Sequence, residues 1–210
     1  MSLTALLNIL ATVAVLALVF AIIYFVSRHE NDDAANSNKA RRASRDGGVG
    51  AALRALQRYA SLHGFQYIQP AHLQSGGREA DLDAILVTYS GVVGIRCLGY
   101  NGEVYATSGE PEWLWVTQES RVRIPDPVTQ SAADVRVLRD ALMKDIKLRN
   151  VAVECLPVFT DKKLQLSAPK SCPIYRPKEL MAALNKGRYL EDKGIDAAGI
   201  AALLRAACGQ

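Results

Sequence analysis

The chain has 210 residues, enough for one domain and an appendage, and half of its residues are hydrophobic. Its formal net charge is +4, and residues 49–210 hold 20 of its 25 basic and 17 of its 21 acidic residues. This near balance excludes the strongly basic surface of a dedicated nucleic-acid-binding domain. The four cysteines show no Cys-x-x-Cys spacing, so we expect a reducing compartment and neither a disulfide nor a zinc site.

Residues 1–27 contain no Asp, Glu, Lys or Arg. As a helix, residues 3–26 would span about 36 Å, which exceeds the roughly 30 Å hydrocarbon core of a bilayer. The alternative is a cleaved signal peptide, which needs a basic start and small residues directly after the apolar run. Tyr24, Phe25 and Val26 do not supply such a cleavage site. We therefore predict an uncleaved transmembrane anchor over residues 1–27.

The basic residues near this anchor all follow it, and they are Arg28, Lys39, Arg41, Arg42 and Arg45. Positively charged flanks of a transmembrane helix stay in the cytoplasm. We therefore predict a single-pass protein of the plasma (inner) membrane, with its N-terminus outside and its C-terminal domain in the cytoplasm. The lipid bilayer is then its partner through residues 3–26.

Residues 28–48 are rich in small, polar and charged residues and show no apolar periodicity. Such a segment buries too little apolar surface to offset the entropy of ordering, so we predict a disordered linker. The basic cluster at residues 39–45 has two interpretations. It is either a solvated tether whose charges set the topology, or a contact with anionic lipid headgroups. Residues 49–210 are predicted to form a single domain.

The domain begins with a predicted helix over residues 49–62, which Gly64 ends. Its apolar face consists of Val49, Leu53, Leu56 and Ala60. A short strand is predicted over residues 65–68, before Pro70. Residues 74–77 are expected to form a loop.

Residues 81–105 contain the clearest strand signals in the chain. Apolar runs lie on either side of Ser90-Gly91, which predicts a hairpin, and Asn101-Gly102 marks a second turn. We expect the strand over residues 103–107 to pair onto this hairpin.

Two further short strands are predicted over residues 113–117 and 121–124. The first contains Trp113 and Trp115. We expect one of these side chains in the core and the other half exposed.

Asp126 is a natural helix N-cap, and Pro127 then occupies the first helical position, where a missing N–H costs nothing. This helix is predicted to continue to about Arg149. Its buried stripe is expected at Ala132, Val135, Leu138, Leu142 and Ile146. The predicted elements that follow are a strand over residues 151–160 and helices over residues 177–185 and 196–207.

Five motifs follow one another along the domain, namely Asp81-Leu82-Asp83, Asn101-Gly102 with Glu103-Val104, Trp113, the run from Asp126 to Gln130, and a strand ending in Phe159-Thr160. In this order and spacing they resemble the nuclease-related domain (NERD) family, a relative of the PD-(D/E)XK nucleases, over roughly residues 48–184. The resemblance implies an α/β fold with a nuclease-like core of a helix, a central mixed sheet, a second helix and a further strand.

In PD-(D/E)XK nucleases, carboxylates hold a divalent cation that activates water, and a lysine stabilises charge. The resemblance places Asp83 at the metal-binding aspartate and Gln130 at the glutamine that starts the following helix. Arg96 and Leu98 stand at the family's Glu and Lys positions, and residues 48–52 offer no helix glutamate. Arginine has only donors and leucine has no charge, so we interpret Asp83, Arg96, Leu98 and Gln130 as a vestigial site.

Two functions remain open. The first is a non-catalytic module that binds a protein partner or nucleic acid at the degenerate site, with no cofactor and no small-molecule substrate expected. The second is a Mg²⁺- or Mn²⁺-dependent nuclease that uses relocated acidic residues. In that case Asp83 and Asp81 would be metal ligands, with Glu79 and Glu103 as further candidates.

The hairpin also suggests what replaces the metal. Folding at Ser90-Gly91 brings positions 83 and 96 together, so we expect the Arg96 guanidinium to bind the Asp83 carboxylate in two parallel hydrogen bonds. The alternative is that Arg96 faces solvent and Asp83 bonds to the backbone. Gln130 likewise has the alternative role of capping the first turn of its helix.

Overall fold

The computed structural model describes residues 17–22, 24, 47–107 and 109–210. The chain divides into two units, Met1–Arg41 and Arg42–Gln210. In the first unit, residues 17–22 and 24 are helical. No helix in the described part of the chain is long and apolar enough to cross a membrane, and most of the anchor predicted over residues 3–26 lies outside that part. The linker segment up to residue 46 lies outside it as well.

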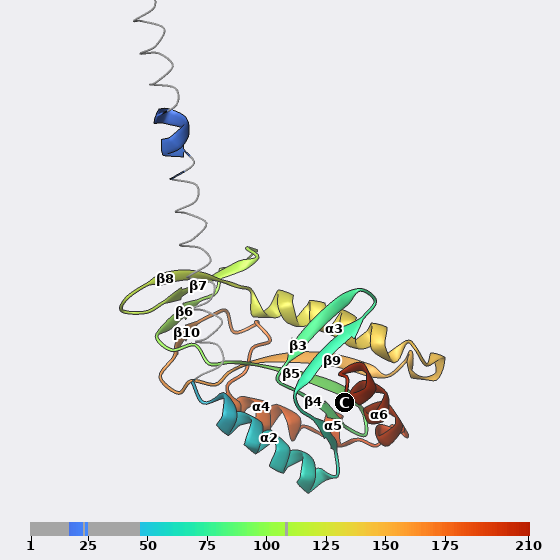
Figure 1. The fold of residues 1–210 in the computed structure, drawn as a ribbon. Coiled ribbons are helices and arrows are strands. Elements are labelled where there is room, and N and C mark those ends of the chain that lie inside the picture. The colour runs from blue at the N-terminus through green and yellow to red at the C-terminus, as the bar shows by residue number, and fades with distance from the viewer. Residues whose placement is uncertain (1–16, 23, 25–46, 108) are drawn as a thin grey trace, which may run out of the picture. The chain divides into compact units, whose positions relative to one another are not determined.

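A four-stranded mixed sheet forms the centre of the second unit (Figure 1). Its strand order is β1 (Gln66–Ile68), β4 (Ala84–Val87), β5 (Gly91–Leu98) and β9 (Ala152–Phe159). β4 and β5 form the predicted antiparallel hairpin around Ser90-Gly91, and β9 runs parallel to β5 along all eight of its residues. All of β4 is buried, because a sheet covered on both faces has no solvent side that needs polar residues. The α/β class with a mixed sheet is confirmed.

Helices cover both faces of this sheet (Figure 1). One face packs against α2 (Val49–His63) and α4 (Pro177–Leu184), which is followed by the short α5 (Gly187–Leu190). The opposite face packs against α3 (Pro127–Leu142) and α6 (Ala197–Ala207). The result is three layers with an apolar core on each side of the sheet.

The expectations for α2 are confirmed. All four residues of its predicted apolar face are buried. Gly64 ends the helix in the left-handed conformation, with φ 68°, which glycine adopts without a Cβ clash.

A two-stranded hairpin, β2 (Ala71–Ser75) and β3 (Arg78–Leu82), lies against α3. The loop expected over residues 74–77 is therefore partly wrong, because Gln74 and Ser75 belong to β2. Only Gly76-Gly77 forms the turn, with φ values of 60° and 71°. The exposed positions of β2 are polar and the strand is only five residues long, so its pattern is too short to separate from a loop.

A second sheet has the order β10 (Gln165–Ser167), β6 (Glu103–Tyr105), β7 (Glu112–Val116) and β8 (Arg121–Pro125) (Figure 1). The expectation that the strand at 103–107 pairs onto the central hairpin is wrong. β6 instead pairs with β7 and, in parallel, with β10. Asn-Gly signals a turn, but it does not say whether the strand after the turn returns to the strand before it.

Both tryptophans are buried, Trp113 at 3% and Trp115 at 2% exposure, so the expectation of one half-exposed ring is wrong. Residues two apart on a strand point to the same face, and this face of β7 is turned inward. Trp113 stacks on Phe159 at the end of β9, and Trp115 Nε1 donates to the Asn101 carbonyl oxygen at 2.7 Å. These contacts attach the second sheet to the first.

α3 begins as predicted, with the Asp126 carboxylate accepting hydrogen bonds from the Val128 and Thr129 backbone N–H groups. It ends at Leu142 rather than near Arg149. A separate 3-10 helix, Ile146–Leu148, follows with Asp145 as its N-cap.

The buried stripe of α3 is rotated from the predicted one. Leu138 and Leu142 are buried as expected, but Ala132 and Ile146 are exposed. The observed buried face consists of Pro127, Ser131, Asp134, Val137, Leu138, Ala141 and Leu142. It contains two polar residues, which a search for apolar spacing passes over.

The other predicted elements agree with the structure within one or two residues, and they correspond to β1, β7, β8, β9, α4 and α6.

Replacing Leu138 by Ala should lower the free energy of unfolding by about 2–5 kcal/mol, because this side chain is fully buried against the central sheet. Ile146→Ala is the matched control. Its side chain is 75% exposed, so its effect should stay within about 0.5 kcal/mol. Urea unfolding followed by tryptophan fluorescence measures both, and equal effects would contradict the observed orientation of α3.

Candidate functional site

A hollow of about 340 Å³ opens near the carboxyl end of β5. Its walls come from the start of α2, the segment between β1 and β2, the end of β3 and the end of β5. They consist of Val49, Leu53, Gln69, Pro70, His72, Asp81, Leu82, Asp83, Arg96, Cys97 and Leu98. The carboxyl ends of parallel strands are the usual place for ligands in open α/β sheets. Four of the sequence-predicted site residues, Asp81, Asp83, Arg96 and Leu98, meet here.

Asp83 stands directly between β3 and β4 and is held by the end of β5. Its backbone N–H donates to the Ile95 carbonyl oxygen at 2.9 Å, and its Oδ2 accepts from the Cys97 backbone N–H at 2.7 Å. Asp83 therefore bonds to backbone as the alternative expected, but the other half of that alternative, an Arg96 that faces solvent, is wrong because the Arg96 side chain is only 18% exposed. The carboxylate closes the strand end, and that hydrogen bond orients one of its oxygens toward the protein rather than toward a ligand.

The Asp83 charge also acts on its neighbours. Burial, and secondly the Asp83 carboxylate, raise the pKa of the Cys97 thiol. Burial, with smaller contributions from Cys97 and Asp83, raises the pKa of Tyr67 to about 12. Both groups are therefore neutral at physiological pH, and neither supplies a thiolate or phenolate nucleophile to the hollow.

Arg96 does not pair with Asp83, as the hairpin had suggested. It binds Asp134 of α3 instead. Arg96 Nε donates to Asp134 Oδ2 at 3.0 Å, and Arg96 Nη2 donates to Oδ2 at 2.8 Å and to Oδ1 at 2.9 Å. The side chains are 18% and 5% exposed, so this ion pair is largely buried.

The packing of α3 explains this choice of partner. Gly94 has no side chain, and a Cβ there would lie 2.7 Å from Cys155 Sγ, 2.9 Å from Leu82 Cδ1 and 3.2 Å from Leu138 Cδ1, so Leu138 of α3 is one of three side chains that fill the space beside Gly94. Two residues along β5 span about 6.6 Å, and one helical turn back along α3 spans about 5.4 Å. Arg96 and Asp134 are therefore set opposite each other once Leu138 packs over Gly94.

Burial raises the pKa of Asp134, while the Arg96 guanidinium lowers it and the nearby Asp81 charge adds a smaller upward contribution. Burial is the largest of these effects, and the net result is a raised pKa. The desolvation of a buried ion pair offsets much of its attraction, so the pair is weak evidence for net stability, although removing one partner is costly.

Leu98 and Gln130 differ in their relation to the hollow. Leu98 is 6% exposed and adds an apolar wall where the family resemblance calls for a lysine. Gln130 lies in the first turn of α3, where its backbone N–H donates to the Asp126 carbonyl oxygen, and it is not among the residues that line the hollow.

The relocated acidic residues are only partly brought together. Asp81 lines the hollow and lies 3.0 Å from His72 Nδ1 across the β2–β3 hairpin. Glu79 is exposed elsewhere on β3, and Glu103 belongs to the second sheet, where it accepts from the Tyr105 hydroxyl. Within the part of the chain that the structure describes, no three His, Cys, Asp or Glu side chains converge as a metal site would require. His72 could not be identified as a site residue from the sequence, because its pairing with Asp81 follows from the register of the β2–β3 hairpin, which was not predicted.

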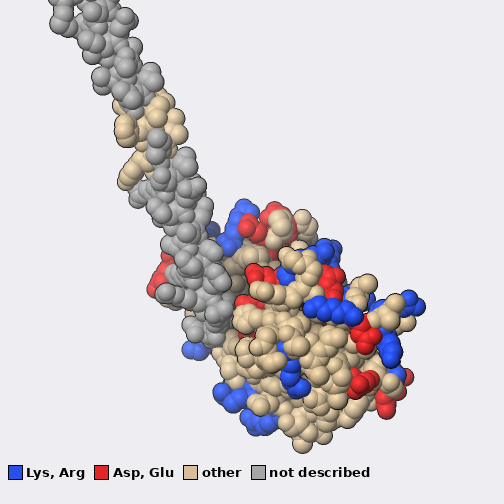
Figure 2. Space-filling view, turned by 45° about the vertical axis from the view of Figure 1, so that its right-hand side comes forward, with Lys and Arg blue, Asp and Glu red and all other residues tan. Residues whose placement is uncertain are grey.

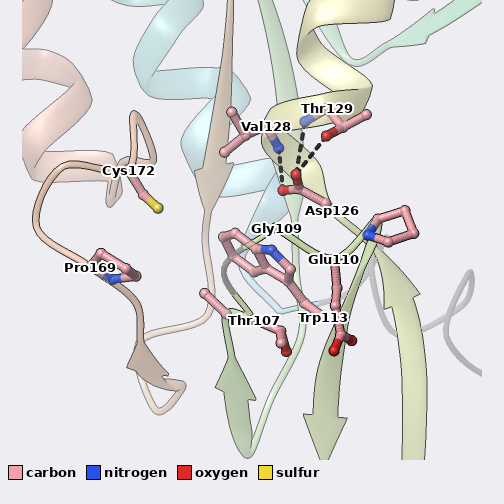
Figure 3. A pocket seen from close by; sticks show the side chains of 11 residues that line it. Thr107, Gly109, Glu110, Trp113, Asp126, Val128, Thr129, Pro169 and Cys172 are labelled. Atoms are coloured by element: carbon pink, nitrogen blue, oxygen red, sulfur yellow. Dashed lines mark hydrogen bonds between the residues drawn. The ribbon is translucent and has the colours of Figure 1, made fainter.

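A second hollow, of about 480 Å³, lies between the N-terminus of α3 and the loop around Cys172 (Figure 3). Figure 3 shows the Asp126 carboxylate turned back onto the helix. It accepts from the Val128 N–H at 2.9 Å and from the Thr129 N–H and hydroxyl at 3.3 and 2.6 Å. The helix terminus, which otherwise attracts anions, already has an internal anion.

The Arg96–Asp134 pair gives a sharp stability prediction. Arg96→Met leaves a buried, unpaired carboxylate and should lower the free energy of unfolding by about 3–5 kcal/mol, whereas Arg96→Met with Asp134→Leu should restore most of it. The single variant should recover stability as the pH falls, because a carboxyl whose pKa is raised by folding stabilises the folded state when protonated and destabilises it as the pH rises through that pKa.

The matched control is Arg123→Met, which removes an exposed arginine 3.7 Å from Glu112 and should change stability by less than about 1 kcal/mol. Urea unfolding of the four proteins across acidic and neutral pH measures these effects. A double variant as unstable as Arg96→Met would contradict this account of the pair.

A search among curated proteins finds no match for the chain. A family model does match it, the one described as nuclease-related domain, over residues 47–160. This span exceeds half of the 210 residues and includes every wall of the hollow near β5, together with Asp134. On this match, and with the α/β fold described above, the chain belongs to the nuclease-related domain (NERD) family.

Proposed function

We propose that this protein is a nuclease-related domain without nuclease activity, anchored to a membrane and acting as a binding module. The observation that supports this most is the bidentate bond from Arg96 to Asp134. At the position where the family resemblance calls for a metal-binding glutamate, the chain places a cation and engages it in a structural pair.

The residues at the hollow do not fit a divalent cation. Mg²⁺ needs several oxygen ligands in octahedral geometry, and a guanidinium offers only N–H donors. One Asp83 oxygen accepts a hydrogen bond from the Cys97 backbone N–H, and Leu98 supplies no ammonium group to stabilise a phosphate.

The hollow itself is the proposed binding site for a protein partner or nucleic acid. Asp81 and Asp83 line it together, with Asp81 Oδ1 3.0 Å from His72 Nδ1, and the charge of Arg96 is engaged with Asp134. Its apolar walls, which include Val49, Leu53 and Leu98, suit an apolar side chain of such a partner.

The membrane anchor is proposed from the sequence. Residues 1–27 are free of charged residues, and the five nearest basic residues follow them. We infer a single-pass protein of the plasma (inner) membrane whose domain lies in the cytoplasm. A helix over residues 3–26 would insert into the bilayer.

A second candidate is a Mg²⁺- or Mn²⁺-dependent nuclease that uses relocated acidic residues. It is favoured by one observation, that Asp81, Asp83 and His72 all line the same hollow. This candidate needs the His72–Asp81 contact to open, because at 3.0 Å it engages one of the two carboxylates.

The full chain should show no Mg²⁺- or Mn²⁺-dependent cleavage of DNA or RNA above a mock preparation, because a metal ligand and the lysine are replaced. Arg96→Glu with Leu98→Lys should not create activity, since the helix glutamate is still missing and Asp134 would lose its cation. Fluorescent-substrate cleavage assays measure this. Robust cleavage by the parent chain that Asp83→Ala abolishes would establish the second candidate.

A reporter enzyme that works only in the cytoplasm should be active when it is fused after Gln210, and one that works only after export should be inactive. The reason is that the basic residues that flank the proposed anchor lie on its C-terminal side. Paired fusions to a cytoplasmic and an exported reporter enzyme measure this orientation. An active exported reporter would refute the proposed topology.

A further inference from the structure

The outer surface of the α2–α4–α5 layer is basic. Arg54 and Arg58 on α2, with Lys178 and Lys186 at the two ends of α4, are all exposed. We call these four residues the basic face. The structure gives none of them an ion-pair partner within its described residues. Arg188 is nearby but is engaged by Glu154 at 3.0 Å.

The two helices share this surface because they pack on the same side of the central sheet. Residues of α2 and α4 belong to one apolar core, and the Tyr59 hydroxyl donates to the Leu184 carbonyl oxygen at 2.8 Å. Their buried faces point to the sheet, so their polar faces point outward together. In Figure 1 both helices lie along the lower edge of the domain, and basic atoms stand without acidic ones at the lower left of Figure 2.

Acidic residues are nearly absent from this layer. Residues 47–64 and 177–190 contain a single one, Glu179, whose carboxylate accepts from the Arg176 backbone N–H. The second sheet, in contrast, carries both signs, with Arg123 Nη1 3.8 Å from Glu110 and 3.7 Å from Glu112. The α2–α4–α5 layer is therefore basic although the net charge of the domain is small.

We propose that the basic face lies against the anionic surface of a lipid bilayer and so orients the domain on the membrane. This inference rests on the membrane anchor of the proposed function. The anchor holds the domain close to lipid, and the cytoplasmic leaflet carries the negative surface potential that basic residues near a membrane recognise.

The exposed side chains of this layer suit a bilayer better than single-stranded nucleic acid. Leu62 is 83% exposed and follows Arg54 and Arg58 at spacings of four residues, so one ridge of α2 presents two cations and an apolar side chain that can enter the headgroup region. Single-stranded nucleic acid is bound through exposed aromatic rings. The tyrosines of this layer, Tyr59 and Tyr189, are 7% and 3% exposed.

The lysines provide a direct test with an internal control. The full chain is reconstituted into nanodiscs of phosphatidylcholine alone or with about one-third phosphatidylserine, and acetylation by a water-soluble reagent is followed by mass spectrometry. Acetylation of Lys178 and Lys186 should slow in the anionic nanodiscs and recover when the ionic strength is raised. Lys144 and Lys147, which are exposed beyond the end of α3 in the opposite layer, should react equally in both.

Arg54→Gln with Arg58→Gln should cancel this protection. Each charge near an anionic surface changes the ratio of docked to free domains about fivefold, so the pair should lower it roughly 25-fold. The matched control, Arg136→Gln with Arg139→Gln, removes two exposed arginines from α3 and should leave the protection unchanged. All four positions are exposed, and circular dichroism checks that the variants fold.

The possible results distinguish a failure of this inference from a failure of the proposed anchor. A chain that stays with both nanodiscs but shows equal acetylation of Lys178 and Lys186 overturns the inference and leaves the anchor standing. A chain that stays only with anionic nanodiscs supports the basic face and refutes the anchor, and a chain that stays with neither overturns both. Protection by a DNA duplex, with none by phosphatidylserine, would assign the face to nucleic acid and overturn the inference.

Discussion

The ion pair between Arg96 and Asp134 and the apolar packing of Leu138 beside Gly94 together fix how α3 lies on the central sheet, and much of the structure depends on that orientation. The ion pair joins the third-last residue of β5 to the second turn of the helix, four residues before Leu138 packs over Gly94. A polar pair inside an apolar interface tolerates few alternative orientations, because any rotation of the helix would leave both charges buried and unpaired. The pair and the apolar packing thus agree on one buried face of α3, which includes Ser131.

The same pair determines the chemistry of the hollow near β5. It engages the charge of Arg96, and Asp81 and Asp83 are the carboxylates that line the hollow. Asp83 meanwhile accepts from the backbone N–H of Cys97 and closes the end of β5. Arg96 and Asp83, which the family resemblance assigns to a catalytic site, thus both serve the architecture of the sheet, and this supports the proposed binding module.

Charge is distributed over the domain in a way that its total does not reveal. The α2–α4–α5 layer presents five exposed basic residues, the four of the basic face and Arg188, and one acidic residue. A domain with such an uneven distribution of charge orients itself in an electric field even when its net charge is small. A membrane anchor would place this domain in such a field, at the surface of a charged leaflet.

Local periodicity and turn chemistry predict the central hairpin, the C-cap of α2, the N-cap of α3 and most strand positions, whereas the family and the α/β class follow from the resemblance of five motifs in order. The hairpin turn also places position 83 near position 96. The partner of Arg96, the pairing of β6 and the His72–Asp81 contact could not be predicted, since each joins elements whose order in space does not follow from local spacing. Asp134 shows the reason most clearly. The spacing of apolar residues in α3 predicts that Asp134 faces solvent. Its burial is favourable only because the Arg96 guanidinium of β5 pairs with it.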